Sequence, residues 1–195
     1  MRKVVILAAM LALSTGAALA DAFEDGATAW RNGDYRTAMN AWKPLADKDA
    51  TIQNNYGVMY MDGKGVTRNY DTARLWFARS AANGNPLGQN NMGGLYRDGK
   101  GVPRDYGKAL IFFKASASQG NAAAQVNLGL MLMNGQGIAV DTVHAYMWFD
   151  LAAQQNLPQA VTNRTNLRQH MTSRDVDQAS QLSKACKSQD FKGCA

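Results

Sequence analysis

The sequence contains few of the side chains that most often perform catalysis. Glu24 is its single glutamate, and it has two histidines, His144 and His170, and two cysteines. A hydrolytic carboxylate pair would have to use aspartates such as Asp62 that lie in turns or at helix starts, and neither histidine has a second one at a zinc-ligand spacing. The sequence therefore predicts no catalytic residue and no metal site.

Motifs for nucleophilic catalysis and phosphate binding are absent as well. There is no Gly-x-Ser-x-Gly segment, no supported Ser-x-x-Lys motif and no catalytic cysteine–histidine pair. The Gly-x-Gly triplets follow predicted helices, whereas a phosphate-binding loop needs a strand before it. We therefore expect a protein that is not an enzyme and that binds no cofactor.

Long apolar runs are confined to the N-terminus. Residues 1–20 combine a basic start at Arg2 and Lys3, an apolar stretch over residues 4–13 and the small-residue segment Ala18–Ala20. This pattern is typical of a cleaved secretory signal peptide, and no later segment approaches transmembrane length. We expect a periplasmic or secreted protein with no stable membrane span after cleavage.

The charge and the cysteines agree with export. The net charge is +6, but the basic residues are not clustered, and an exported protein is not expected to bind nucleic acid. Both cysteines, Cys186 and Cys194, lie in the C-terminal tail. An even pair in an exported chain predicts a disulfide, which would hold the tail against the last helix.

The most informative feature present is a repeat of 36 residues. Residues 52–85 and 88–121 share 18 of 34 positions, and a third copy follows. Eight residues recur 36 and 72 positions later: Gln53, Asn55, Gly57, Gly63, Gly65, Ala73, Phe77 and Ala81. Such units stack because none can bury its apolar face alone, so we expect function to lie on the surface of the stack.

Each unit is predicted to contain two helices. In the second copy, the first helix covers Gln89 to Asp98 and ends at Gly99 in the left-handed conformation. The second runs from about Tyr106 to Gln119, with inward-facing residues predicted at Ala109, Ile111, Phe112, Phe113 and Ala117. Glycine in mid-helix at residues 57, 93 and 129 predicts a close approach between the two helices.

These residues resemble a known family. Tyr56 to Tyr60, Gly63 to Val66, Ala73, Trp76, Ala81–Ala82 and Gly84 match the signature of the Sel-one-like repeats, which are related to tetratricopeptide repeats. The resemblance implies an all-α fold, a right-handed α-solenoid of antiparallel helix pairs. We expect a partial repeat over residues 21–49, three repeats over 50–157, and capping helices with the disulfide-closed tail over 158–195.

The resemblance also implies a function. It favours a protein–protein interaction scaffold or adaptor, with regulation in the bacterial envelope as one such role, that holds a protein or an extended peptide in a concave groove. The first helix of each pair would line the groove with Asn54, Val58, Met61, Asn90, Gly94, Arg97, Val126, Leu130 and Met133. The alternative is a hydrolase of beta-lactam or cell-wall substrates, although the family members credited with that activity carry a cysteine pair in every repeat.

Overall fold

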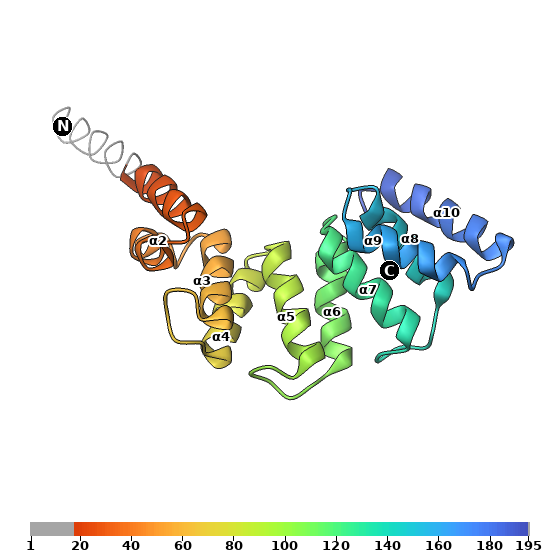
Figure 1. Cartoon of the computed structure of the whole chain (residues 1–195), viewed down its shortest axis with the longest axis horizontal. Helices are drawn as coiled ribbons and strands as arrows, with labels where there is room; N and C mark the ends of the chain where they lie inside the picture. The colour runs from red at the N-terminus through yellow and green to blue at the C-terminus, as the bar shows by residue number, and fades with distance from the viewer. Residues whose placement is uncertain (1–17, 195) are drawn as a thin grey trace, which may run out of the picture. The chain divides into compact units, whose positions relative to one another are not determined.

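The computed structural model describes residues 18–194, which form helices and no strand. Residues 18–31 are helical. The described chain then forms α2 Tyr35–Trp42, α3 Ala50–Asp62, α4 Tyr70–Ala82, α5 Pro86–Asp98, α6 Tyr106–Ala117, α7 Ala122–Asn134, α8 Thr142–Ala153, α9 Pro158–Arg168 and α10 Ser173–Ser188 (Figure 1). The predicted all-α class is confirmed.

The predicted signal peptide lies mostly outside the described residues, which begin at residue 18. Within residues 18–194, no helix has the length and apolar character needed to span a bilayer. The described residues divide into two compact units, with the boundary between Trp76 and Phe77.

In the first unit, the helical residues 18–31, α2 and α3 are joined through two aromatic side chains. The indole N–H of Trp42 donates to the carbonyl oxygen of Phe23 at 3.1 Å. Gly26 makes room for that indole, because a Cβ at this position would collide with the ring. The hydroxyl of Tyr56 in α3 donates to the carbonyl oxygen of Met39 in α2 at 2.6 Å. The N-terminal helices therefore have specific packing of their own.

From α5 to α8 in the second unit, polar side chains begin the helices, and glycines end α5 and α7. The side chain of Asn85 accepts two backbone amides of the first turn, so α5 begins at Pro86, three residues before the predicted start at Gln89. Gly99 ends α5 with φ of 70°, as predicted, because glycine adopts this left-handed conformation without steric cost. The same cap ends α7, at Gly135.

Glycine also marks where the paired helices touch. A Cβ on Gly93 of α5 would lie 2.7 Å from Cδ1 of Phe113 in α6. A Cβ on Gly129 of α7 would lie 2.6 Å from Cε1 of Phe149 in α8. Both rings are fully buried. The predicted close approach is therefore confirmed in these two pairs.

The inward face of α6 differs from the prediction at one residue. Phe113 and Ala117, four positions apart, are fully buried as predicted, and Phe112 stacks on Tyr96 with ring centroids 5.8 Å apart. Ile111 is 67% exposed, so its predicted inward orientation is wrong. The physical reason is helical periodicity, since a residue two positions before Phe113 points to the opposite side of the helix.

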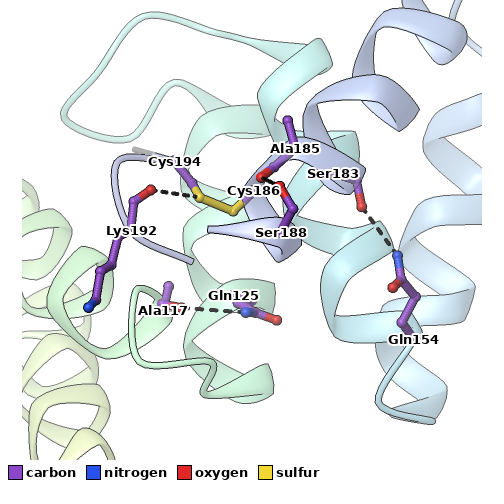
Figure 2. Close-up of a disulfide and its surroundings, with 9 residues drawn as sticks. All are labelled: Ala117, Gln125, Gln154, Ser183, Ala185, Cys186, Ser188, Lys192 and Cys194. Atoms are coloured by element: carbon purple, nitrogen blue, oxygen red, sulfur yellow. Dashed lines mark hydrogen bonds between the residues drawn. A yellow bond between two sulfur atoms is a disulfide. The ribbon is translucent and has the colours of Figure 1, made fainter. Parts of the chain in front are cut away.

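The last helix and the tail close the second unit. Thr172 caps α10, and its hydroxyl accepts the backbone N–H of Asp175 at 3.2 Å, as predicted. Cys186 of α10 is bonded to Cys194, with 5.4 Å between their Cα atoms, so the predicted disulfide is present. Figure 2 shows the tail folding back to place Cys194 against the end of α10.

A carboxylate holds the last three helices together. One oxygen of Asp150 in α8 accepts from Arg164 in α9 at 2.7 Å, and the other accepts from the Ser183 hydroxyl in α10 at 2.7 Å and from Gln154 at 2.9 Å. Burial is the largest influence on the pKa of Asp150 and raises it, but these hydrogen bonds together outweigh burial and hold the pKa below its ordinary value. The sequence did not indicate this network.

Candidate functional site

The predicted binding residues of the second unit lie on α5 and α7, the first helices of two consecutive pairs. Asn90, Gly94 and Arg97 belong to α5, and Leu130 and Met133 belong to α7; all five are partly exposed. These five residues together with Asn127 of α7 are called the A-helix face below. In the first unit, Val58 and Met61 of α3 are also partly exposed.

Two of the predicted binding residues are not on the surface. Asn54 is 4% exposed and Val126 is 3% exposed, so the prediction that their side chains line a groove is wrong. Because a helix turns about 100° per residue, a shift of one position moves a side chain from the interior to the surface. Asn55 and Asn127, one residue further on, are partly exposed. The signal was present, because this asparagine recurs in all three copies.

Asn127 links the first helices of two consecutive repeats. Its side-chain amide donates to Oδ1 of Asn90 at 2.9 Å, and its own Oδ1 accepts from Nη1 of Arg97 at 2.8 Å. One residue of α7 thus fixes two residues of α5 that lie two turns apart. The sequence predicted Asn90 and Arg97 as separate members of a surface row, and the structure places them in one hydrogen-bond network.

Arg97 is held on three sides. Its Nε and Nη2 donate to the two carboxylate oxygens of Asp98 at 2.7 Å and 3.3 Å, and its guanidinium lies 5.8 Å from the ring centroid of Phe113. The hydrogen bond from Arg97 is the largest influence on the pKa of Asp98, which lies below its ordinary value. Within residues 18–194, three of the five guanidinium N–H groups donate to Asp98 and Asn127.

Gly94 leaves open space beside this network. Among residues 18–194, no heavy atom outside its own turn of helix lies within 4 Å of the position that its Cβ would occupy. The neighbouring Gly93 is tightly packed, so the two consecutive glycines of α5 have different roles. The polar groups of Asn90 and Arg97 can therefore be approached from solvent across Gly94.

The recurrent glutamines have a structural role. The side-chain oxygen of Gln89 accepts from the amide of Gln119, beyond the end of α6, at 2.7 Å. The side-chain oxygen of Gln125 accepts from Gln155, beyond the end of α8, at 3.1 Å, and Gln125 is fully buried. The bonds tie the end of the second helix to the start of the first, which accounts for the repetition of this residue.

His144 forms a local pair with an acidic residue. Nδ1 of His144 lies 2.7 Å from Oδ2 of Asp141, the residue that caps the start of α8. Among residues 18–194, no group of three or more His, Cys, Asp and Glu side chains could hold a metal ion. The geometry at the A-helix face suits binding through hydrogen bonds and apolar contact.

Comparison with known proteins agrees with the repeat and its fold. A family model described as the Sel1 repeat matches residues 52–85, 86–121 and 122–157. A search of curated proteins finds no match. A solved structure of a protective antigen of uropathogenic Escherichia coli strains, which displays an SLR fold, is 32% identical, with a TM-score of 0.72 over 80% of this chain. A Sel1 repeat protein from Oxalobacter formigenes is 26% identical, with a TM-score of 0.68 over 73% of this chain. The chain spans 34% of the first protein and 59% of the second.

Proposed function

The chain belongs to the Sel1 repeat family, and from that premise we propose that it is an exported scaffold that binds another protein through the A-helix face, and not an enzyme. The partner is a protein segment in extended conformation. A regulatory role in the bacterial envelope would use the same face.

The observation that carries the proposal is the fixed polar network beside open space. Asn127 holds Asn90 and Arg97 in place, so these side chains lose little conformational freedom when a ligand binds. Asparagine and arginine provide the donors that an extended peptide needs for its backbone carbonyls. Leu130 and Met133 add partly exposed apolar surface, and methionine adapts to ligands of different shape.

The proposed location rests on the cysteines and the N-terminal sequence. A disulfide between Cys186 and Cys194 is the form expected in an oxidising compartment such as the periplasm or the extracellular medium. It agrees with the signal peptide predicted over residues 1–20. We therefore place the protein in the bacterial envelope or outside the cell.

Site-specific crosslinking tests the surface and identifies the partner together. A photo-reactive amino acid at position 94 of the full-length protein, expressed in the native host, should crosslink to one protein. The same group at position 111, on the exposed side of α6, serves as the control, because it crosslinks proteins that contact a different surface of the chain. The captured partner is then purified, and its affinity for the unmodified protein is measured by calorimetry.

Two arginine substitutions then locate the site. Gly94→Arg fills the open space and should weaken binding at least tenfold without loss of stability, because nothing packs against this position. Ile111→Arg adds the same side chain at another exposed helical position and should leave the affinity for this partner unchanged. If Gly94→Arg binds as well as the wild type, the A-helix face is not the site.

A further inference from the structure

One position on the outer side of α6 is exposed although its counterpart in α8 is covered. Gly107, Ile111, Lys114 and Ser118, in α6 and at its C-cap, lie 36 positions before Val143, Met147, Asp150 and Gln154, in α8 and at its C-cap. Met147 is 2% exposed, whereas its equivalent Ile111 is 67% exposed. Gly107, Ile111, Lys114 and Ser118 are called the outer α6 face.

Helix α10 shows what kind of element fits this side of a repeat. Its buried residues are small and lie four and three positions apart: Ala179, Ser183 and Cys186. The Ser183 hydroxyl donates to Asp150, and the ammonium of Lys187 donates to Gln154 at 2.9 Å; Figure 2 shows Gln154 reaching Ser183 as well. An amphipathic helix with a narrow, small-residue stripe and charged flanks therefore covers α8.

The charge at the centre of the outer α6 face is opposite to that on α8. Lys114 occupies the position of Asp150, and within residues 18–194 its ammonium has no hydrogen bond or ion pair. Lys108, earlier in α6, pairs with the carboxylate of Asp105, 3.5 Å away, and its ammonium lies 5.3 Å from the ring centroid of Tyr96 in α5. Lys114 is therefore the residue of this face that can pair with a carboxylate, at the place where α8 itself carries one.

An apolar pocket adjoins the outer α6 face. Lys114 also lines a cavity of about 150 Å³, whose mostly apolar walls are formed by Leu128, Leu132, Ile138 and Trp148, together with Asp141, His144 and Cys194. A cavity of about this size and composition can hold a benzene-sized group. The pocket gives the outer α6 face a place for one large apolar side chain.

The loop at this pocket departs from the repeat pattern. Arg104 in the second repeat lies 5.4 Å from the ring centroid of Tyr106, whereas the third repeat has Val140 at the position of Arg104. Val140 is 62% exposed and Ile138 is 36% exposed. The third repeat thus lacks a stacked cation and presents two aliphatic side chains near the pocket.

We propose that the outer α6 face and the adjoining pocket form a second docking surface, whose ligand is an acidic amphipathic helix of another protein. The helix lies on α6 as α10 lies on α8, pairs a carboxylate with Lys114 and inserts one apolar side chain into the pocket. A second copy of this chain is disfavoured as the ligand, because the chain carries a net charge of +6. The surface is separate from the A-helix face, which lies on α5 and α7.

A synthetic helix tests the proposal on the full-length protein. The probe is a peptide of 16 residues, the length of α10, with alanine and leucine at the i, i+4 and i+7 positions and glutamate on both flanks. A control peptide has lysine in place of each glutamate. Fluorescence polarisation measures the affinity, and the indole NMR signal of Trp148 reports entry into the pocket.

The expected pattern is specific to charge and position. The acidic peptide should bind the wild type and shift the Trp148 signal. Lys114→Glu and Ile111→Arg should each weaken the affinity for this peptide at least tenfold. The lysine peptide should bind Lys114→Glu more tightly than the wild type. Gly94→Arg should have no effect, so failure here is distinct from failure at the A-helix face. Circular dichroism checks that each variant is folded.

Three results would overturn the proposal. One is the absence of binding by the acidic peptide at concentrations up to about 1 mM, since a dissociation constant of about 1 mM corresponds to a binding free energy of about 4 kcal/mol. Another is equal binding of the acidic and lysine peptides. The third is concentration-dependent self-association that Ile111→Arg abolishes, since this would make a second copy of the chain the ligand.

Discussion

The two consecutive glycines of α5 should respond to the same substitution with opposite signs. Alanine is favoured over glycine in a helix interior by about 1 kcal/mol, and this gain applies equally at Gly93 and Gly94. At Gly94 nothing lies within 4 Å of the new methyl group, so Gly94→Ala should raise the free energy of unfolding by about 0.5 to 1 kcal/mol.

At Gly93 the same methyl group has no space. It would lie 2.7 Å from two carbons of the Phe113 ring, which is fully buried and cannot move away without displacing α6. Overpacking costs about 1 to 3 kcal/mol, and against a fully buried ring we expect the upper half of this range, which exceeds the helical gain of about 1 kcal/mol. Gly93→Ala should therefore lower the free energy of unfolding by about 1 to 2 kcal/mol, and the larger Gly93→Leu should lower it further.

Urea denaturation followed by circular dichroism measures both variants under one set of conditions. The difference between them should be about 2 kcal/mol, which in thermal melts corresponds to roughly 4 to 8 °C for a chain of this size. Lys100→Ala, in the exposed turn after α5, serves as the control and should stay within about 0.5 kcal/mol of the wild type. Equal stability of Gly93→Ala and Gly94→Ala would refute the assignment of the two sides of α5.

Four further outcomes are expected. Asp150→Asn should lower the free energy of unfolding by about 2 to 3 kcal/mol. Because the folded pKa of Asp150 is depressed, its contribution is present above the unfolded pKa of about 4 and is lost as the pH falls further, so acid titration of the variant should lack this loss. Replacing Cys186 and Cys194 by serine should cost about 2 to 3 kcal/mol, and an unchanged urea midpoint would contradict this. Burial raises the pKa of the Tyr56 hydroxyl to about 12, so this hydroxyl ionises in the unfolded chain at a lower pH than in the folded chain. The free energy of unfolding should therefore fall between about pH 10 and pH 12, and Tyr56→Phe should remove that fall. Purified protein should hydrolyse no chromogenic beta-lactam above the buffer rate, and sustained turnover would contradict a non-enzymatic scaffold.

The features that sequence predicted well are those set by local chemistry or by repetition. Gly99 and Gly135 end helices because only glycine adopts their backbone conformation freely, and this requirement is visible without any tertiary information. Thr172 begins α10 for an equally local reason, the cap of a free backbone amide. The close approach at Gly93 could be predicted because glycine, which is unfavourable inside a helix, recurs there every 36 residues.

The features that sequence missed depend on which elements come together. Val126 and Asn127 are neighbours on the same helix, and only the packing of α7 decides which one is buried. Asp150 carries no repeat signal, and its partners Arg164 and Ser183 are 14 and 33 residues away. Periodicity therefore identified the helices and their paired faces, but it could not identify contacts made once, at the end of the array.

The distinction between repeated and unrepeated positions also bears on where specificity lies. Gln89 and Gly93 are repeated because each copy must make the same contact with its own partner helix, and both are occupied by that contact. Gly94, Arg97 and Lys114 differ from their equivalents in the third repeat, which has Leu130, Met133 and Asp150 at those places. Stacking of the repeats does not require one residue type at such positions. The side chains of Arg97 and Lys114 are partly exposed to solvent, and Gly94 has open space beside it. A ligand that distinguishes one repeat of this chain from another must therefore contact positions where the copies differ, such as Gly94 and Arg97 of the A-helix face and Lys114 of the outer α6 face.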